Sequence, residues 1–508
     1  MSNGDLVISA DFGTSGVKVG VVDHALTILA RVTESYPLTL ATGGVAEQAP
    51  EDWWAALAKA VAALHLEVPD LSERAGALVF SSQLCGVVCC DANGVALRPC
   101  LTWLDKRAAP LGKKLVGGFP EVHGYKAHRL LKWLRIANGA PAKNGMDPTA
   151  KMLWVKENEP EIYAKTHWMV DVKDWLVHRA TGEMTTCPES ANLSWVMDTR
   201  LGREGWSEAL CHMTGIDQRK LAPIVQADHV VGPLTAQAAS DLGLRATVRV
   251  LGGTSDVMAS TLGSGEVEDG ALHVSLATSA WIAGFFPDRR ISVAHSYATV
   301  TSGLDFRPLL IASQENAGSA LDWVRNITGG APAETAFADI GTPQKDDPFF
   351  LPWLAGERVP VDNDSLRGTF HGLSLRHDSN ALRRAAIEGV ALNLRWAMSK
   401  VAREKGAKTA GPLSIVGGVA SNATFAQTLS DALNRDIRVC SARHAGMLGT
   451  ATLAAPLMGW AASSTEAATR LKSRSSATFT PNPDRAAALT ERANRLTKLR
   501  RHVIRSYS

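Results

Sequence analysis

The stretch Ile8-Ser9-Ala10-Asp11-Phe12-Gly13-Thr14-Ser15-Gly16-Val17-Lys18-Val19-Gly20-Val21-Val22 decides the fold. An apolar run, a carboxylate, a tight turn of small residues and an alternating strand together predict a β-hairpin with a polar tip. Gly13 and Gly16 allow the backbone to curl, so that amide N–H groups and hydroxyls converge on one point. Such a point suits a phosphate, and Asp11 beside it suits the divalent cation that accompanies phosphates.

The same pattern returns 264 residues later, as Ser275-Leu276-Ala277-Thr278-Ser279-Ala280-Trp281-Ile282-Ala283-Gly284-Phe285. Thr14 aligns with Thr278, Ser15 with Ser279 and Gly20 with Gly284. Two phosphate-type hairpins in one chain imply two related domains that face each other across a nucleotide.

Composition agrees with a two-domain enzyme. A chain of 508 residues is too long for one core. Apolar residues make up 45% and charged residues 20%, which excludes wholesale disorder. The net charge of +3 (53 basic minus 50 acidic residues) is too balanced for a nucleic-acid binder. We interpret the one concentrated basic stretch, 492–505, as the solvated face of a terminal helix.

Cysteine usage and hydropathy indicate a cytoplasmic protein without a membrane segment. The seven cysteines form no C-x-x-C pair and have no zinc-type spacing to histidine, so we expect reduced thiols. The N-terminus lacks the cationic and apolar run of a secretory signal. Residues 445–465 carry no charge over 21 positions, but glycines and Pro456 interrupt them. We therefore expect a buried helix followed by a turn rather than a membrane span.

Strand-like and helix-like patterns alternate along the chain, which predicts the α/β class. The Gly-rich, acidic segment 262–271 is the expected boundary between the halves. We predict an N-terminal domain over 1–262, a C-terminal domain over 271–460, and an extension over 461–508. For the residues past about 470 we expect a polar loop and a helix.

Several further motifs, in order along the chain, resemble the FGGY carbohydrate kinases, and among these most closely the xylulokinases. The resemblance covers residues 7–457. The stretch 146–158 fits the first family signature at every constrained position, and 368–388 nearly fits the second. Shorter xylulokinase-like stretches are 47–54, 321–323 and 350–360.

The resemblance implies two ribonuclease H-like domains, of the actin, Hsp70 and sugar-kinase superfamily, with an interdomain cleft. It implies ATP-dependent phosphorylation of a small ketose, D-xylulose to D-xylulose 5-phosphate, with ATP and Mg²⁺ as cofactors and neither nucleic acid nor membrane as partner. A homodimer is compatible with the family. A nucleotide-regulated binding protein of the actin/Hsp70 type is a distant alternative. A P-loop kinase is excluded because no G-x-x-x-x-G-K-[ST] occurs.

Asp256 is the expected catalytic base. It follows a strand and a Gly-Gly-Thr-Ser turn, and phosphorylating a hydroxyl needs a carboxylate to accept the proton. From the residues alone a turn residue or a helix N-cap is the favoured interpretation, whereas the resemblance to the family reverses this in favour of catalysis. Asp11 is expected beside Mg²⁺. The expected nucleotide- and phosphate-binding residues are Asp11, Gly13, Thr14, Ser15, Lys18, Thr278, Gly318, Asp322, Gly417, Gly418 and Asn422.

The expected substrate-binding residues are Gln83, Leu84, Cys85, Asp105, Arg107 and Asp256. Asp105 and Arg107 could instead pair with each other on a surface loop. Xylulokinases usually have Met-His where this chain has Leu84-Cys85, and Asn where it has Val257. These replacements remove polar side chains that could bond sugar hydroxyls. A kinase for a tetritol, another pentulose or a linear signalling sugar therefore stays an alternative.

Overall fold

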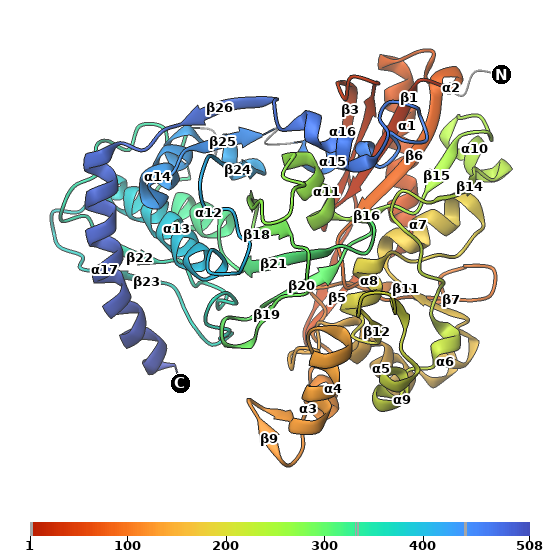
Figure 1. The fold of residues 1–508 in the computed structure, drawn as a ribbon, viewed down its shortest axis with the longest axis horizontal. Coiled ribbons are helices and arrows are strands. Elements are labelled where there is room, and N and C mark those ends of the chain that lie inside the picture. Colours follow the sequence, from red (N-terminus) through yellow and green to blue (C-terminus); the bar gives the residue numbers. More distant parts are fainter. Residues whose placement is uncertain (1–3, 331, 333–334, 441–443, 508) are drawn as a thin grey trace. The chain divides into compact units, whose positions relative to one another are not determined.

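The computed structural model of the chain describes residues 4–330, 332, 335–440 and 444–507. It consists of two compact units that interleave along the sequence. The first unit contains residues 1–263, 300–309 and 446–468, and the second contains 264–299, 310–445 and 469–508. Each unit is described by itself below (Figure 1).

The first unit is built on a seven-stranded sheet in the order β14-β15-β6-β1-β2-β3, with β16 also paired to β6. β1 runs antiparallel to β2, as the predicted hairpin requires, and parallel to β6. Every residue of β1 except Asp11 is buried, and its Leu6, Ile8, Ala10 and Phe12 side chains lie in the apolar core. The strands are β1 (Leu6–Phe12), β2 (Gly16–Val22), β3 (Ile28–Ser35), β6 (Ala75–Ser82), β14 (Val230–Pro233), β15 (Arg249–Leu251) and β16 (Thr254–Ser255).

Helices complete the core of the first unit. α1 (Pro50–Glu67) has Pro50 at its first position and two acidic residues in its first turn, which favour helix initiation. Its buried Trp53 packs edge-on against Trp175 of α7, with ring centroids 6.1 Å apart. The other helices before residue 265 are α2 (Leu71–Arg74), α3 (Ala109–Val116), α4 (Ala127–Ala137), α5 (Pro148–Asn158), α6 (Pro160–Lys165), α7 (Val172–Thr181), α8 (Pro188–Leu193), α9 (Glu208–Thr214), α10 (Ala236–Leu242) and α11 (Asp256–Ser264). The late segment 446–468 adds most of α15 (Ala445–Thr452) and the start of α16 (Ser464–Leu471).

Short strand pairs decorate the first unit outside the main sheet. They join β4 (Thr39–Ala41), β5 (Val45–Gln48) and β8 (Cys100–Leu101); β7 (Val88–Cys90) and β11 (Trp168–Val170); β9 (Glu121–Val122) and β10 (Tyr125–Lys126); and β12 (Met197–Asp198) and β13 (Gly205–Trp206). A second apolar cluster, centred on the fully buried Trp133, lies among these pairs and α4, α5 and α9.

The second unit repeats the plan of the first. Its eight strands follow the order β19-β20-β21-β18-β17-β24-β25-β26. In both sheets an antiparallel hairpin is followed by two parallel neighbours and then by an antiparallel edge strand. The internal repeat of the two hairpins is therefore a repeat of whole sheets. The strands are β17 (His273–Leu276), β18 (Ala280–Phe285), β19 (Ile291–Ser292), β20 (Tyr297–Thr301), β21 (Pro308–Gln314), β24 (Leu413–Val416), β25 (Ile437–Cys440) and β26 (Ser475–Phe479).

The helices of the second unit pack on this sheet around the long, largely buried α13. They are α12 (Gly318–Ile327), α13 (Ser379–Val401), α14 (Ala423–Leu433) and α17 (Pro483–Ser506). A further strand pair joins β22 (Phe349–Leu351) and β23 (Thr369–His371).

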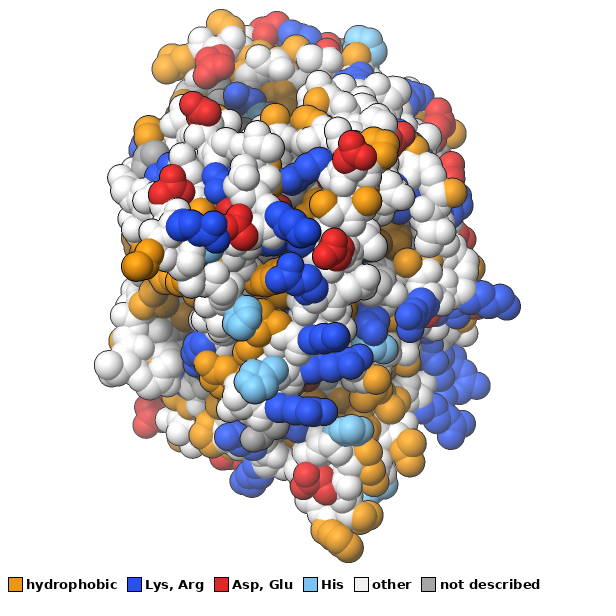
Figure 2. Space-filling view, turned by 90° about the vertical axis from the view of Figure 1, so that its left-hand side faces the viewer, with side chains coloured by type: hydrophobic (Ala, Val, Ile, Leu, Met, Phe, Trp, Pro, Cys, Tyr) orange, Lys and Arg blue, Asp and Glu red, His pale blue; other side chains and the backbone are white. Residues whose placement is uncertain are grey.

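The C-terminal segment departs from its prediction in two ways. The expected polar loop contains β26, which pairs antiparallel with β25. The basic run at 492–505 lies on α17, but it is not simply a solvated face, because Arg492 and Arg500 are buried. The Arg492 guanidinium lies 2.7 Å from a carboxylate oxygen of Glu388. The other Lys and Arg side chains of the run are exposed, and Figure 2 shows Lys and Arg side chains gathered on the face that carries α17.

The uncharged stretch at 445–465 forms α15 (Ala445–Thr452), a turn, and the start of α16 (Ser464–Leu471), as expected. In the part of the chain that the structure describes, no helix has both the length and the apolarity needed to cross a membrane.

Candidate active site

The carboxyl edge of the first sheet brings two predicted carboxylates together. Asp11 stands next to last in β1 and pairs in register with Ser81 of β6. Ser81 in turn pairs with Thr254 of β16, two residues before Asp256. Because parallel strands end at the same edge, Asp11 and Asp256 both lie at the carboxyl ends of these strands, where α/β proteins bind ligands.

Asp256 is the first residue of α11. Its Oδ1 accepts a hydrogen bond of 2.8 Å from the backbone N–H of Val257. Burial, followed by the negative charges of Asp11 and Asp171, raises the pKa of Asp256 to about 7. A carboxylate with that pKa exchanges a proton near neutral pH, which is the property required of a general base.

Asp11 has an environment suited to a cation. The Ser81 hydroxyl donates a hydrogen bond of 2.8 Å to Asp11 Oδ1, and burial raises the pKa of the carboxyl. The other oxygen faces Gly446 of α15, where a Cβ would lie only 2.6 Å from it. Among the described residues no group of three side chains could hold a metal by itself. A single hard carboxylate fits a Mg²⁺ ion that phosphates hold as well.

The tip of the first hairpin is held by side chains that the prediction did not include. The Trp103 indole donates a hydrogen bond of 2.9 Å to Thr14 Oγ1, which donates to Gln83 Oε1 at 3.2 Å. Gln48 Nε2 donates to the Thr14 carbonyl at 2.7 Å. Ser15 and Lys18 are exposed. The predicted phosphate loop is therefore fixed at Thr14 and open beyond it.

The predicted sugar segment follows β6. Gln83 is buried, and its amide joins Thr14 to Gln48, whose Oε1 accepts from Gln83 Nε2 at 2.9 Å. Gln83 thus supports the neighbouring loop, whereas Leu84 and Cys85 are half-buried. Cys85 has φ of 65°, a left-handed conformation that is rare for a non-glycine residue.

Asp105 and Arg107 pair with each other, as one of the two interpretations holds. Three hydrogen bonds of 2.9–3.2 Å join the guanidinium to the carboxylate. Asp105 is fully buried rather than on a surface loop, and it also accepts from the Ala46 N–H at 2.9 Å. The contact of either residue with sugar stays a prediction.

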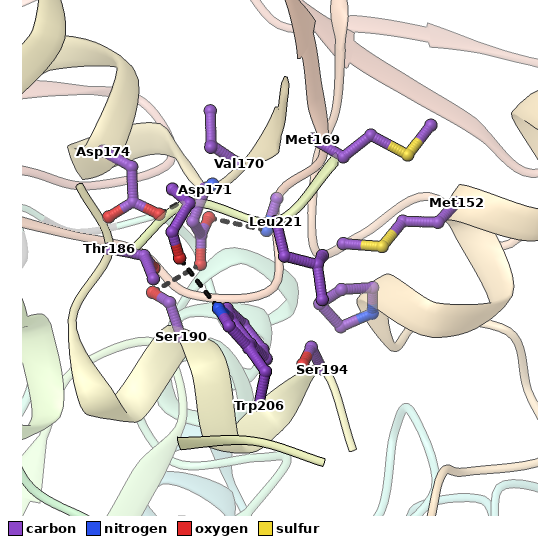
Figure 3. A pocket seen from close by; sticks show the side chains of 13 residues that line it. Met152, Met169, Val170, Asp171, Asp174, Thr186, Ser190, Ser194, Trp206 and Leu221 are labelled. Atoms are coloured by element: carbon purple, nitrogen blue, oxygen red, sulfur yellow. Dashed lines mark hydrogen bonds between the residues drawn. The ribbon is translucent and has the colours of Figure 1, made fainter. Parts of the chain in front are cut away.

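A buried carboxylate, Asp171, was missed from the sequence. It accepts hydrogen bonds from the backbone N–H groups of Cys85 (3.1 Å) and Gly86 (2.9 Å) and from the Ser190 hydroxyl (2.9 Å). Figure 3 shows Asp171, Asp174 and Ser190 around a small hollow of about 20 Å³, room for one water molecule. The only signal in the sequence was an Asp before a helix, which indicates an N-cap and nothing more.

In the second unit the predicted nucleotide segments lie at the matching edge of their own sheet. The Ala277 carbonyl and the Thr278 carbonyl accept hydrogen bonds from the first N–H groups of α12, at Gly318 (2.9 Å) and Ser319 (3.0 Å). Gly417 follows β24, has φ of +97°, and lies so close to Leu276 that a Cβ would be 2.3 Å from its carbonyl oxygen. Thr278, Gly318 and Gly417 are therefore brought together.

Three other predicted residues of this unit differ in their surroundings. Gly418 is exposed, and a Cβ placed there would meet nothing within 4 Å. Asn422 caps α14 by accepting from the Phe425 N–H at 2.9 Å. Asp322 lies on the exposed side of α12, 3.2 Å from Arg325. Their contacts with nucleotide stay predictions.

Comparison with known proteins bears on both units. Residues 6–263 match the N-terminal domain, and residues 287–458 the C-terminal domain, of the FGGY family of carbohydrate kinases. The xylulose kinase of Escherichia coli K12 is 29% identical over 88% of this chain and 89% of its own length. The gluconokinase of Bacillus subtilis 168 is 24% identical over 88% and 86%. A crystal structure described as a "xyloylose kinase" from Brucella ovis matches with a TM-score of 0.85 and 26% identity, over 97% and 98% of the chains.

Proposed function

The chain belongs to the FGGY family of carbohydrate kinases, and we propose that it transfers the γ-phosphoryl group of ATP to D-xylulose, giving D-xylulose 5-phosphate. One observation carries the proposed chemistry: Asp256 begins α11 at the same carboxyl edge of the sheet as Asp11, in surroundings that raise its pKa to about 7. The xylulose kinases among the similar proteins support the choice of a ketopentose.

Asp256 is the general base of the proposed reaction. The sugar hydroxyl loses its proton to the carboxylate as its oxygen attacks the γ-phosphorus and the bond to the ADP oxygen breaks. A general base contributes roughly 10²–10⁴-fold to the rate. The Val257 N–H fixes the Oδ1 of the base, which aims the remaining lone pairs.

Phosphate charge is balanced by the hairpin and by Mg²⁺. We assign the triphosphate to the loop Gly13–Thr14–Ser15 and to Thr278, and the adenosine to the segment at Gly417, Gly418 and Asn422. Mg²⁺ would be held beside Asp11 and would neutralise charge on the phosphates. Thr14 presents its hydroxyl and amide from a fixed tip, because Trp103 and Gln48 hold it.

A second substrate class follows from the residues of the sugar segment. Leu84 and Val257 are apolar, and Cys85 is a weak hydrogen-bond donor. A site with fewer polar groups discriminates less strongly among polyols. The gluconokinase relative makes a linear sugar acid the alternative substrate to test.

The test is a substrate panel in a coupled assay of ADP formation. D-Xylulose, D-ribulose, L-ribulose, erythritol, glycerol and gluconate are compared by kcat/KM with MgATP. We expect D-xylulose to lead the panel. A larger kcat/KM with gluconate or a tetritol would replace xylulose, and ATP hydrolysis that no sugar accelerates would overturn the kinase assignment.

We place the enzyme in the cytoplasm, with small molecules as its only partners. Its seven cysteines form no disulfide, which suits a reducing compartment. A homodimer stays a prediction, and sedimentation velocity of the purified chain would test it.

A further inference from the structure

The first turn of α7 touches two segments of the candidate site through adjacent side chains. Asp171, the N-cap of α7, bonds the sugar segment after β6. Lys173, two residues on, bonds the turn that leads to Asp256. Both side chains are almost fully buried, at 5% and 1% exposure. Burying a charged side chain costs free energy unless a partner compensates the charge, so the partners of these two residues need an explanation.

Asp171 holds the peptide between Cys85 and Gly86. Its two oxygens accept from the two successive N–H groups of that segment, while Ser190 and the Val172 N–H satisfy its remaining lone pairs. Gly86 is required for this approach, because a Cβ there would lie 2.8 Å from Asp171 Oδ1.

A buried lysine contacts the same segment at a backbone carbonyl. Lys151 of α5 donates a hydrogen bond of 2.8 Å from Nζ to the carbonyl oxygen of Cys85. Cys85 is thereby kept at φ of 65°, a conformation that costs a non-glycine residue free energy. Strain of this kind persists only where the surroundings over-determine it, and here Lys151 and Asp171 do so.

Lys173 contacts the turn at Gly252 and Gly253, which leads to Asp256. Its Nζ donates a hydrogen bond of 2.8 Å to the carbonyl of Gly252 and lies 2.7 Å from Asp174. Its aliphatic stem passes so close to Gly253 that a Cβ there would be 3.0 Å from Lys173 Cδ. Gly253, with φ of +70°, turns the chain into β16 and α11, the helix that begins at Asp256.

Asp174 connects the contacts made by Asp171 and Lys173. Its carboxylate pairs with Lys173 and also accepts from the backbone N–H of Asp171 at 3.1 Å, closing a capping box. The sugar segment and the catalytic turn are therefore both fastened to one rigid helical turn.

We propose that this turn sets the position of the sugar relative to the catalytic base, with Asp171 positioning the sugar segment and Lys173 positioning Asp256. The inference rests on the proposed sugar-kinase function and names residues that act through others rather than on the substrate itself. It explains why two buried charges of opposite sign stand two residues apart at a helix start.

The first test is Asp171→Asn, which keeps the size of the side chain but turns donors toward the N–H groups of the sugar segment. We expect KM for the preferred sugar to rise roughly 10-fold or more, with KM for MgATP unchanged. The pH at which kcat is half-maximal should also fall, because Asp171 no longer raises the pKa of Asp256. Loss of folded enzyme alone would move neither quantity.

A readout without substrate follows from Cys85, whose thiol is half-buried while the other six are buried. Alkylation by iodoacetamide, followed by peptide mass spectrometry, measures how firmly the segment is held. We expect Cys85 to react several-fold faster in Asp171→Asn than in the wild type. Asp217→Asn is the matched control, because it changes a helix-capping carboxylate whose hydrogen bonds go to Arg219 of its own turn, and it should leave the rate unchanged.

The second test is the double variant Lys173→Met/Asp174→Asn, which leaves no unpaired buried charge and preserves the acceptor for the Asp171 N–H. A rapid-quench single turnover should show a slower rate at unchanged amplitude, because the sites are intact but the base is misplaced. Cys85 alkylation should stay at the wild-type rate. A lower amplitude at unchanged rate would overturn the role of Lys173.

The outcomes separate the two proposals. If the wild type phosphorylates no sugar, the proposed function is wrong. The alkylation rates still decide whether Asp171 holds the sugar segment at Cys85 and Gly86. An active wild type whose Asp171→Asn variant keeps its sugar KM, pH profile and Cys85 reactivity overturns the positioning role.

Discussion

Replacing the proposed base by Asp256→Asn is expected to make the protein less active and more stable at the same time. The change removes proton acceptance, so kcat should fall roughly 10²–10⁴-fold while the KM values for sugar and MgATP change little. With a pKa of about 7, the ionised fraction of Asp256 in the wild type is about one-tenth at pH 6 and about nine-tenths at pH 8. Wild-type kcat should therefore rise about tenfold across that interval, and the residual activity of the variant should lack this limb.

The gain in stability follows from the same shift. The pKa of Asp256 is raised from 3.8 when unfolded to about 7 in the folded chain, so the unfolded state releases the proton first as pH rises. The wild type consequently loses stability between about pH 4 and pH 7, whereas the asparagine variant does not. The full shift corresponds to about 4 kcal/mol. Because the carboxylate is partly open to solvent, we expect about 1–2 kcal/mol at pH 8 and almost none at pH 4.

Coupled ADP assays and urea unfolding at pH 4, 6 and 8 measure both effects on one preparation. Asp217→Asn serves as the control, since its carboxylate is only half-buried and a hydrogen bond from Arg219 lowers the pKa of Asp217 rather than raising it. Near-normal kcat in Asp256→Asn would refute the catalytic assignment. A variant less stable than the wild type at pH 8 would refute the account of why the pKa is raised.

Three further expectations concern other parts of the chain. Gly418→Leu should fold normally, because the added side chain meets open space, but it should raise KM for MgATP at least several-fold by occupying the proposed adenine position. Gly417→Ala should instead lower the melting temperature, because its Cβ would lie 2.3 Å from a backbone carbonyl oxygen. Gln48→Leu releases the tip of the first hairpin and should raise KM for MgATP with a smaller effect on the sugar, as initial-rate kinetics would show. Arg492→Met leaves the buried Glu388 with Arg485, 3.7 Å away, as its remaining cation, and should cost about 1–3 kcal/mol of unfolding free energy. The exposed Lys498→Met should be neutral within about 0.5 kcal/mol in the same denaturant titration.

Local patterns predicted the elements whose apolar periodicity is strong. Both predicted hairpins form, and their repetition along the chain is confirmed. β26 was not predicted because Ser475–Phe479 is mostly exposed and its apolar alternation is limited to Ala477 and Phe479. Its pairing with β25 defines it as a strand. The burial of Arg492 likewise depends on a glutamate distant in sequence, which no local pattern reveals.

The residues of the candidate site also differ in how far the sequence could predict them. Asp11, Thr14 and Asp256 could be selected because each stands in a motif with a chemical reason for its spacing. Asp171 could not, because its partners at Cys85 and Gly86 lie some 85 residues earlier and are backbone N–H groups, which leave no mark on the sequence. Gln83 shows the converse: its position was foreseen, but its amide supports the hairpin tip.

The first unit draws on a late piece of the chain, and this bears on how the protein is made. α15 supplies Met447, whose carbonyl accepts from the Ser9 hydroxyl at 2.7 Å, and Gly449, which packs directly on α11. Neither contact can form on the ribosome until translation has passed residue 452, although strand β1 is synthesised first. A nascent or recombinant fragment ending at 263 would leave the side of Ser9 and Ala259 that faces α15 open to water, so the first unit should complete its core only after residues 446–468 have been synthesised.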